Sequence, residues 1–519
     1  MLRTAGAGHR SLILTAMIFA VSMTFIDQTI VALAVPELQK DLGLSATGTQ
    51  WIINAYLLSL SALFAFGGRI ADIAGHRRMV YVGVVIFAVA SALCGATPTN
   101  DLAEPWMITF RVIQGAGAAI MFPAALAIVV AAFPLAERGK ALALFFGITG
   151  GLTALGPFLG GYLTEWTWRS IFWVNIPVAI VALVLTAISK PEDTRRPAPL
   201  DWRGTALIAS GMGLAVLGLQ QSSAWGWTSA ATILCIAGGL LLLAAFVRYE
   251  MRADDPLIDM DVFSSRGFSA ANGVLFLLMM VFIPVFFFTS LYAQISLGED
   301  PSSAGLFLLV FFAGFGVAAQ WGGRIYDARG VRAAVLPGCA LGAVGFFLWA
   351  RSLDDFSLGD QWIWIVMAGA GCGLVLGPAS TDAVNRVPAA RYGEATGITQ
   401  TIRNFGASIG LAVLGTILII RNTSNIETSL GALGVPADRA DAIAGALSQS
   451  GGGAASGELG DAAGPVAERA FEAVRDDFAH STQTVFYVMA GIMVATYLVA
   501  HVWLPRDRVV ADEAQGPPG

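Results

Sequence analysis

The stretch "GGRIADIAGHRR" at residues 67–78 recurs, slightly altered, as "GGRIYDARGVR" at residues 322–332. Both copies carry a glycine pair, an arginine, an aspartate and a later glycine in the same register, 255 residues apart. Each copy lies at the edge of a long apolar run. A charged, glycine-rich phrase that returns at matching edges indicates two related halves within one chain.

Apolar residues make up 56% of the 519 residues, and charged residues only 13%. A soluble globular chain carries roughly 25% charged residues. Helices embedded in a bilayer explain the shortage, because about 20 apolar residues cross the hydrocarbon layer with every backbone hydrogen bond made inside the helix. We therefore expect an all-α polytopic membrane protein in contact with membrane lipids.

The remaining composition excludes several classes of partner. No block of basic residues indicates a nucleic-acid partner. The four cysteines fall inside apolar runs and the four histidines are scattered, which favours packing over a disulfide framework or a metal site. The sequence has no G-x-x-x-x-G-K-[ST] phosphate loop, and no cofactor is expected.

Apolar runs bounded by charges and by Pro/Gly clusters predict fourteen helices. They are expected near residues 11–36, 50–67, 79–97, 105–132, 139–162, 170–189, 203–220, 230–248, 268–293, 304–323, 333–351, 361–382, 394–419 and 482–504. With the N-terminus inside, about 21 basic residues flank the spans on the cytoplasmic side and about 7 on the outer side. This asymmetry predicts a multi-pass protein of a bacterial plasma membrane with both termini in the cytoplasm.

The first apolar run resembles a signal peptide only superficially. It extends to about Pro36, carries Asp27 and lacks a small-x-small cleavage site, so a retained helix is expected. The long connection at residues 420–481 is rich in Gly, Ala, Ser and Asp, and we expect it to be outside and largely flexible. Its end, residues 466–478, has helical spacing and is expected to lie along the membrane surface. The tail after Pro505 is expected to be disordered.

The positions of the two copies also predict the domain organisation. The first copy follows the second predicted helix and the second copy follows the tenth, so two helices are inserted between halves of six. The expected divisions are an N-terminal six-helix bundle at 1–189, a linker with the inserted helices at 190–262, a C-terminal six-helix bundle at 263–505 and a cytoplasmic tail at 506–519. Repeated bundles of this kind are typical of transporters, in which one half rocks against the other.

Motifs along nearly the whole chain resemble those of the major facilitator superfamily, specifically its fourteen-helix drug:proton antiporter branch (the EmrB/QacA type). They are "IDQTIVALAVP" (26–36), "TQWIINAYLL" (49–58), the phrase at 67–78, "RVIQGAGAA" (111–119), "GPFLGG" (156–161), "WRSIFWVNIP" (168–177), "LYAQISLGEDPSSAG" (291–305) and "GEATGITQTIRNFGASIG" (393–410). The resemblance implies a major facilitator fold of two pseudo-symmetric six-helix bundles plus two central helices. Ile73 and His76 stand where the family motif commonly has basic residues, and Ala32 stands where asparagine is usual.

Asp27 lies about fifteen residues into the first predicted helix, well inside the bilayer. An ionised carboxylate is costly there unless it is paired or neutralised, which suits a group that binds and releases protons. Arg111 in the fourth predicted helix keeps its charge and therefore needs acceptors inside the bundle. The resemblance implies that both residues serve proton coupling, and a purely structural role is the alternative for each.

The repeated phrase predicts a latch at the cytoplasmic face. Glycines let backbones approach closely, an aspartate favours a neighbouring helix N-terminus, and arginines supply ion pairs that exist only while the halves touch. The expected latch residues are Gly68, Asp72, Arg77, Arg78 and Asp327. A basic turn that simply obeys the positive-inside rule is the alternative.

The fifth predicted helix carries Gly156, Pro157, Gly160 and Gly161, which the resemblance identifies as an antiporter motif. Small residues allow tight packing and Pro157 interrupts the hydrogen-bond ladder, so this helix can bend where the halves rock. Generic small-residue packing would give the same pattern.

Arg403, Tyr56 and Gln114 are expected to contribute to a substrate cavity. For Arg403, pairing with Gln400 or with backbone carbonyls is an equal alternative. The run at residues 276–294 is dense in Met and Phe, which suits an adaptable apolar site, although a lipid-facing surface is the stronger expectation.

The sequence as a whole predicts a proton-coupled exporter of amphipathic small molecules such as drugs or antibiotics, acting as a monomer and not as an enzyme. A dedicated exporter of one metabolite, lipid or self-made antibiotic is the alternative. Asp27 is the only acidic residue expected in mid-span, so neutral, zwitterionic or monocationic substrates are favoured over multivalent cations. An enzyme or receptor would need a polar catalytic cluster, and none is visible in the sequence.

Overall fold

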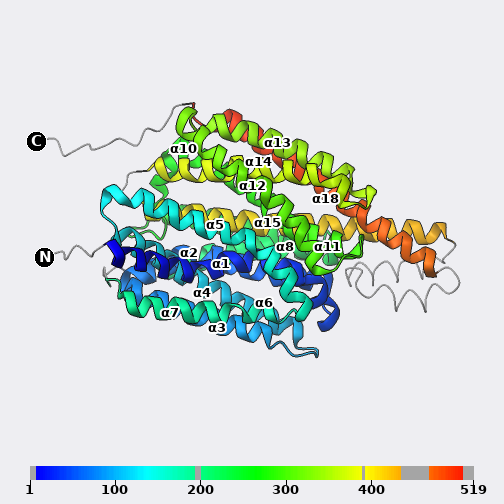
Figure 1. Ribbon diagram of the computed structural model, residues 1–519, viewed down its shortest axis with the longest axis horizontal. Helices are drawn as coiled ribbons and strands as arrows, with labels where there is room; N and C mark the ends of the chain where they lie inside the picture. The colour runs from blue at the N-terminus through cyan, green and yellow to red at the C-terminus, as the bar shows by residue number, and fades with distance from the viewer. Residues whose placement is uncertain (1–6, 193–199, 388–391, 434–466, 507–519) are drawn as a thin grey trace, which may run out of the picture.

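The computed structural model describes residues 7–192, 200–387, 392–433 and 467–506. All regular structure in these ranges is helical, and the long helices run side by side through the molecule (Figure 1). Thirteen helical segments are long and apolar enough to cross a membrane. A further helix of 32 residues, α5 (Leu135–Trp166), lies among them. The predicted all-α polytopic class is confirmed.

The first set of helices covers the first six predicted spans. It comprises α1 (Ala7–Leu42), α2 (Ala46–Ala74), α3 (His76–Gly95), α4 (Ala103–Ala132), α5, α6 (Ser170–Trp173) and α7 (Asn175–Ser189). The two helices predicted as an insertion follow as α8 (Trp202–Trp225) and α9 (Ala230–Glu250), which pack against each other.

The second set begins after a short 3-10 turn, η1 (Met260–Ser264). It comprises α10 (Arg266–Phe282), α11 (Pro284–Ile295), α12 (Pro301–Arg329), α13 (Val331–Arg351), the 3-10 turn η2 (Leu353–Asp355), α14 (Leu358–Asn385), α15 (Tyr392–Ala432) and α18 (Ala467–Trp503). Each predicted range therefore falls on one helix or on one helix pair. The ninth range is split before Pro284, because proline has no N–H to continue the ladder.

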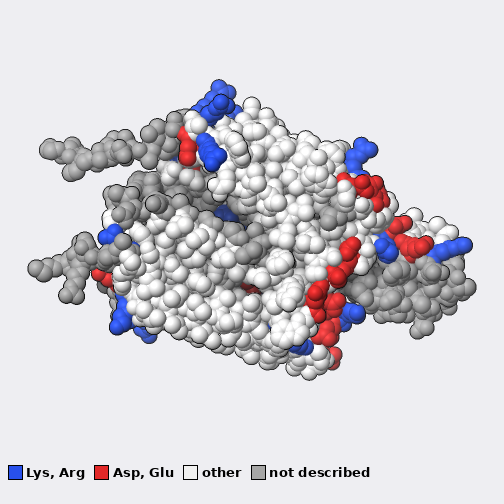
Figure 2. All heavy atoms as spheres, viewed as in Figure 1, with Lys and Arg blue, Asp and Glu red and all other residues white. Residues whose placement is uncertain are grey.

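The beginning of α1 and the end of α18 lie at the same end of the molecule (Figure 1). We call this the inner end and the opposite one the outer end. On the face shown in Figure 2, Lys and Arg predominate toward the inner end, most Asp and Glu lie toward the outer end together with some Lys and Arg, and the band between them is almost entirely uncharged. Such a band is what a hydrocarbon layer requires.

Both copies of the repeated phrase end a long helix with the same turn. Gly75, with φ 103°, separates α2 from α3, and Gly330, with φ 82°, separates α12 from α13. Glycine adopts positive φ without the steric cost that other residues incur. The glycine shared by the two copies therefore marks equivalent turns in the two sets of helices.

The long outer connection is more helical than predicted. α15 continues to Ala432, and α18 already begins at Ala467, so residues 467–478 extend the last span instead of lying along the membrane surface. The reason is packing: Val474 and Phe478 are buried within the protein. Residues 434–466 and the C-terminal tail, both expected to be flexible, lie outside the described residues.

We call residues 420–432 and 467–481 the outer stalk. Its two helices are joined by a hydrogen bond from Ser429 Oγ to Asp477 Oδ1 at 2.9 Å and by one from Asn425 Nδ2 to Ser481 Oγ at 3.0 Å. The stalk projects beyond the other helices at the outer end (Figure 1).

The two sets of helices meet closely toward the outer end. Gly161 of α5 packs on the start of α12, where a Cβ would lie only 2.6 Å from the carbonyl oxygen of Pro301. Gln294 of α11 donates a hydrogen bond to the carbonyl of Leu33 in α1 at 3.0 Å. These contacts join the two sets of helices on their outer side.

The inserted helix α8 packs against a second junction of the two sets, between α2 and α15. Gln220 Oε1 accepts a hydrogen bond from Asn54 Nδ2 of α2 at 2.6 Å, and Asn54 Oδ1 accepts one from Ser408 Oγ of α15. Thr416 of α15 donates to the carbonyl of Leu219 at 3.0 Å. α8 therefore joins one helix from each set.

Replacing Gln220 with Leu is expected to destabilise the protein by about 1–3 kcal/mol, because the buried amide of Asn54 loses its acceptor. Heat unfolding of the purified protein in detergent measures the effect. Ser210→Ala is the control, since that exposed hydroxyl bonds to the Ala206 carbonyl of its own helix. Equal midpoints for wild type and Gln220→Leu would contradict the role of α8.

Candidate functional site

Asp27 of α1 and Arg111 of α4 form a buried ion pair. Arg111 Nη1 lies 2.5 Å from Asp27 Oδ2, and neither side chain is more than 1% exposed. The structure thus brings together the two residues predicted to serve proton coupling.

Gln114, one turn after Arg111, completes a ring with the pair. Its Oε1 accepts from Arg111 Nη1 at 2.8 Å, and its Nε2 donates to Asp27 Oδ1 at 2.9 Å. Arg111 Nε donates to the Ile52 carbonyl at 2.7 Å, and the guanidinium lies 4.4 Å from the centre of the Tyr56 ring. We call Asp27, Arg111, Gln114 and Tyr56 the charge cluster.

The charge cluster compensates each buried charge with a partner. Both carboxylate oxygens of Asp27 accept a hydrogen bond, one from Arg111 and one from Gln114. Removing one partner of such a pair typically costs about 3–5 kcal/mol, because the other charge stays buried without compensation. The cluster therefore ties α1, α2 and α4 together in mid-bundle.

Two glycines of the predicted helix 5 motif face α1. A Cβ on Gly160 would lie 2.8 Å from the carbonyl oxygen of Ile30, and Gly156 likewise has no room for a side chain. Gly161 instead packs on α12, in the second set. Pro157 falls within α5. The motif thus lets α5 approach both α1 and the other set of helices.

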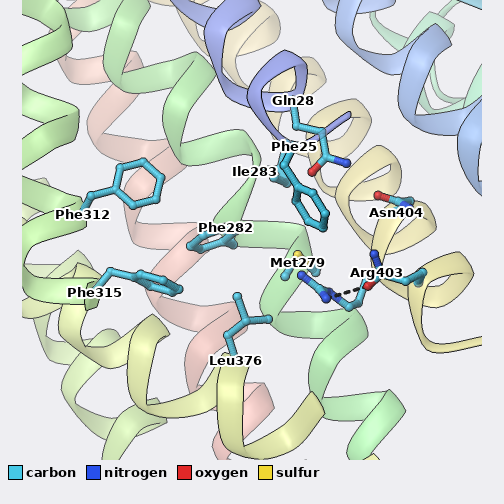
Figure 3. Close-up of a pocket in the computed structure, with 11 residues that line it drawn as sticks. Phe25, Gln28, Met279, Phe282, Ile283, Phe312, Phe315, Leu376, Arg403 and Asn404 are labelled. Atoms are coloured by element: carbon cyan, nitrogen blue, oxygen red, sulfur yellow. Dashed lines mark hydrogen bonds between the residues drawn. The ribbon is translucent and has the colours of Figure 1, made fainter. Parts of the chain in front are cut away.

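A cavity lies between the two sets of helices (Figure 3). The volume that water-sized molecules can occupy in it is about 60 Å³. Small-molecule pockets commonly span ~300–1,000 Å³, so the cavity is narrow in this conformation. Its lining is mostly apolar and aromatic with four polar side chains. The lining residues are Phe25, Gln28, Met279, Phe282, Ile283, Phe312, Phe315, Leu376, Gln400, Arg403 and Asn404.

Of the three residues predicted for a substrate cavity, only Arg403 lines it. Its guanidinium extends into the cavity, and Nη1 donates to Gln400 Oε1 at 2.6 Å, the pairing that the sequence left open (Figure 3). Tyr56 and Gln114 are fully buried in the charge cluster instead. There Gln114 supplies a hydrogen-bond acceptor for the guanidinium of Arg111, and the ring of Tyr56 packs against it.

α1 connects the charge cluster with the cavity. Asp27 binds Arg111 of α4, whereas its neighbours Phe25 and Gln28 line the cavity. Any displacement of α1 that follows a change at Asp27 therefore also moves the cavity wall.

The predicted latch residues lie at the inner end. They are Gly68 and Asp72 on α2, Arg77 and Arg78 in the first turn of α3, and Asp327 near the end of α12. Asp72 Oδ1 lies 3.0 Å from His76 Nε2, so in this conformation its partner belongs to the same half. Asp327 is exposed. His76, which departs from the family motif, is thus the hydrogen-bonding partner of Asp72.

The sequence did not identify most of the cavity wall. The Met- and Phe-rich run was expected mainly to face lipid, yet Met279, Phe282 and Ile283 line the cavity and every residue from Pro284 to Ala293 is buried. A useful signal would have been the polar Gln28 and Asn404 inside otherwise apolar helices. In the part of the chain that the structure describes, no three His, Cys, Asp or Glu side chains gather as metal ligands.

Comparisons with known proteins agree with this architecture. Residues 17–411 match the family described as the Major Facilitator Superfamily. The tetracenomycin C resistance and export protein of Streptomyces glaucescens is 34% identical over 413 residues, covering 79% of this chain and 76% of that protein. The cephamycin export protein CmcT of Amycolatopsis lactamdurans is 35% identical over 457 residues, covering 84% and 90%.

Among solved structures, a bacterial homologue of the human lysosomal transporter Spinster, in an inward-facing and unoccupied conformation, has the same fold. Its TM-score is 0.64 at 14% identity, covering 96% of this chain and 98% of that chain. From the match over most of its length and from these relatives, the chain belongs to the Major Facilitator Superfamily.

Proposed function

We propose that this protein exports amphipathic small molecules in exchange for protons. The observation that carries the proposal is the buried Asp27–Arg111 pair between α1 and α4, whose aspartate is a near neighbour in α1 of the cavity-lining Phe25 and Gln28. The export and resistance proteins among its relatives support export as the direction. The inner end, with both termini, would face the cytoplasm of a bacterium, and the protein would act as a monomer in the plasma membrane.

The charge cluster supplies the coupling step. With Asp27 ionised, the pair holds α1 against α4. A proton on Asp27 removes the ionic attraction and leaves Arg111 with Gln114 Oε1 and the Ile52 carbonyl as acceptors. α1 then shifts and carries Phe25 and Gln28 with it, so the cavity changes with the protonation state. A driving force of roughly 180 mV supplies about 4 kcal/mol per proton.

The two sets of helices would act as the two rocking bundles of residues 1–189 and 263–505. The outer contacts at Gly161 correspond to a cavity closed toward the outside. In the outward-open state these contacts would separate, and the latch residues of the two sets would come into contact at the inner end. Catalysis is not proposed, because the described cavity lining contains no Ser, Cys, His, Asp or Glu that could act as a nucleophile or base.

Asp27→Asn should abolish gradient-driven transport, lowering probe accumulation at least about tenfold, because the amide cannot take up and release a proton. Everted vesicles acidified inside are incubated with 1-pyrenebutyrate, 1-pyrenebutanol or 4-(1-pyrenyl)butyltrimethylammonium in the medium, and accumulation of the probe inside is followed by fluorescence. Asp382→Asn is the matched control, since Asp382 is a buried carboxylate paired with Arg386 at 3.2 Å. Undiminished accumulation in Asp27→Asn would remove the proposed coupling role.

Gly161→Val should slow transport at least about tenfold, because the added side chain overlaps the Pro301 carbonyl and prevents outer closure. Gly238→Val is the control, since nothing lies within 4 Å of a Cβ at Gly238. Initial rates in the same vesicles are compared at equal protein amounts. Equal rates for the two variants would argue against closure at this contact.

Asp72→Asn and Asp327→Asn test the latch. Each substitution should lower the transport rate several-fold, because it weakens the state in which the inner end is closed. The two decreases should differ in size, because Asp72 has a histidine partner, His76, in its turn, whereas Val331 stands at the matching position after Asp327. Rates that match wild type in both variants would show that the repeated phrase serves topology alone.

A further inference from the structure

We propose that the cavity selects amphiphiles with a single negative charge, a carboxylate or phenolate on an aromatic or apolar body, and that Arg403 binds this charge. The inference rests on the proposed export function and names its substrate class. It departs from the neutral, zwitterionic or monocationic substrates that the sequence favours.

The cavity wall carries one positive charge and no negative charge. Among the lining residues that the structure describes, Arg403 is the single ionisable side chain. The carboxylate of Asp27 is 0% exposed and is bound by Arg111 and Gln114. A cationic substrate would therefore meet the charge of Arg403 without a compensating carboxylate.

Arg403 has hydrogen-bond donors that make no hydrogen bond within the described residues. A guanidinium has five N–H donors in a planar fork. One donates to Gln400 Oε1 at 2.6 Å, and Nε is buried without a hydrogen-bond partner among the described residues. A buried donor without an acceptor is unfavourable, and a carboxylate or phenolate oxygen would supply one together with the missing counter-charge.

The remaining lining of the cavity is apolar and aromatic, which suits the body of such an amphiphile once the two sets of helices move apart. Phe282 and Phe315 lie with ring centroids 5.3 Å apart, and Phe312 lies 6.0 Å from Phe315. Arg403 and Asn404 approach from α15 on the opposite side of the cavity (Figure 3). An apolar body can contact these rings while its charged group reaches the guanidinium.

Binding of the three pyrene probes to purified protein in phosphatidylcholine nanodiscs, without any gradient, tests the inference. The probes share one aromatic body and differ in charge. The wild type should bind the carboxylate at least about tenfold more tightly than the alcohol, and the ammonium most weakly. Arg403→Gln should lose this preference and retain its affinity for the alcohol, whereas Arg403→Lys should keep part of the preference.

Arg351→Gln is the matched control, because it removes an exposed arginine at the end of α13 and should leave all three affinities unchanged. Equal binding of the three probes by the wild type, or preference for the ammonium, would overturn the inference. A carboxylate preference that persists in Arg403→Gln would overturn the role of Arg403. Should Arg403→Gln fail to fold, the wild-type series and Arg403→Lys still decide.

The outcome is separable from the proposed function. Carboxylate-selective binding without gradient-driven accumulation of any probe would reject proton-coupled export and support the binding site. Gradient-driven accumulation of the alcohol or the ammonium, but not of the carboxylate, would support proton-coupled export and reject selection of anionic substrates.

Discussion

A carboxylate can remain inside a bilayer-embedded bundle only if its charge is compensated there. Asp27 meets this condition through Arg111, and the surrounding packing follows from it. The guanidinium needs further acceptors, which Gln114 and the Ile52 carbonyl provide, and these contacts bring α1, α2 and α4 to one point. The absence of side chains on Gly156 and Gly160 then lets α5 close against α1.

The same compensation explains why the two intramembrane arginines behave differently. Arg111 has a carboxylate at 2.5 Å and is sealed from the cavity. Arg403 has the neutral Gln400 and faces the cavity. One arginine is thus a fixed element of the protein's own electrostatics, whereas the other leaves part of its hydrogen-bonding capacity for a molecule that enters.

Much of the fold could be predicted from the sequence, because long apolar runs and a repeated charged turn follow from one-dimensional constraints. Each predicted span falls on one helix or one helix pair, and Gly75 and Gly330 both end a helix with positive φ. The Asp27–Arg111 pair could be anticipated, since two buried opposite charges require partners. The remaining site depends on which helix faces contact each other, and composition does not encode that. Tyr56 and Gln114 were therefore assigned to the wrong environment, and the contact of Gln220 with Asn54 was not foreseen.

The outer stalk adds a mechanical property to this arrangement. A helix of 41 residues, such as α15, is about 60 Å long, roughly twice the thickness of the hydrocarbon layer. It carries Arg403 near its inner part and the bond to Asp477 near its outer tip. The stalk is thus continuous with a helix of the cavity wall. An antibody fragment bound to the stalk would restrict the movement of α15 along its whole length. It would also give a small membrane protein a rigid marker beyond the helix bundle for imaging.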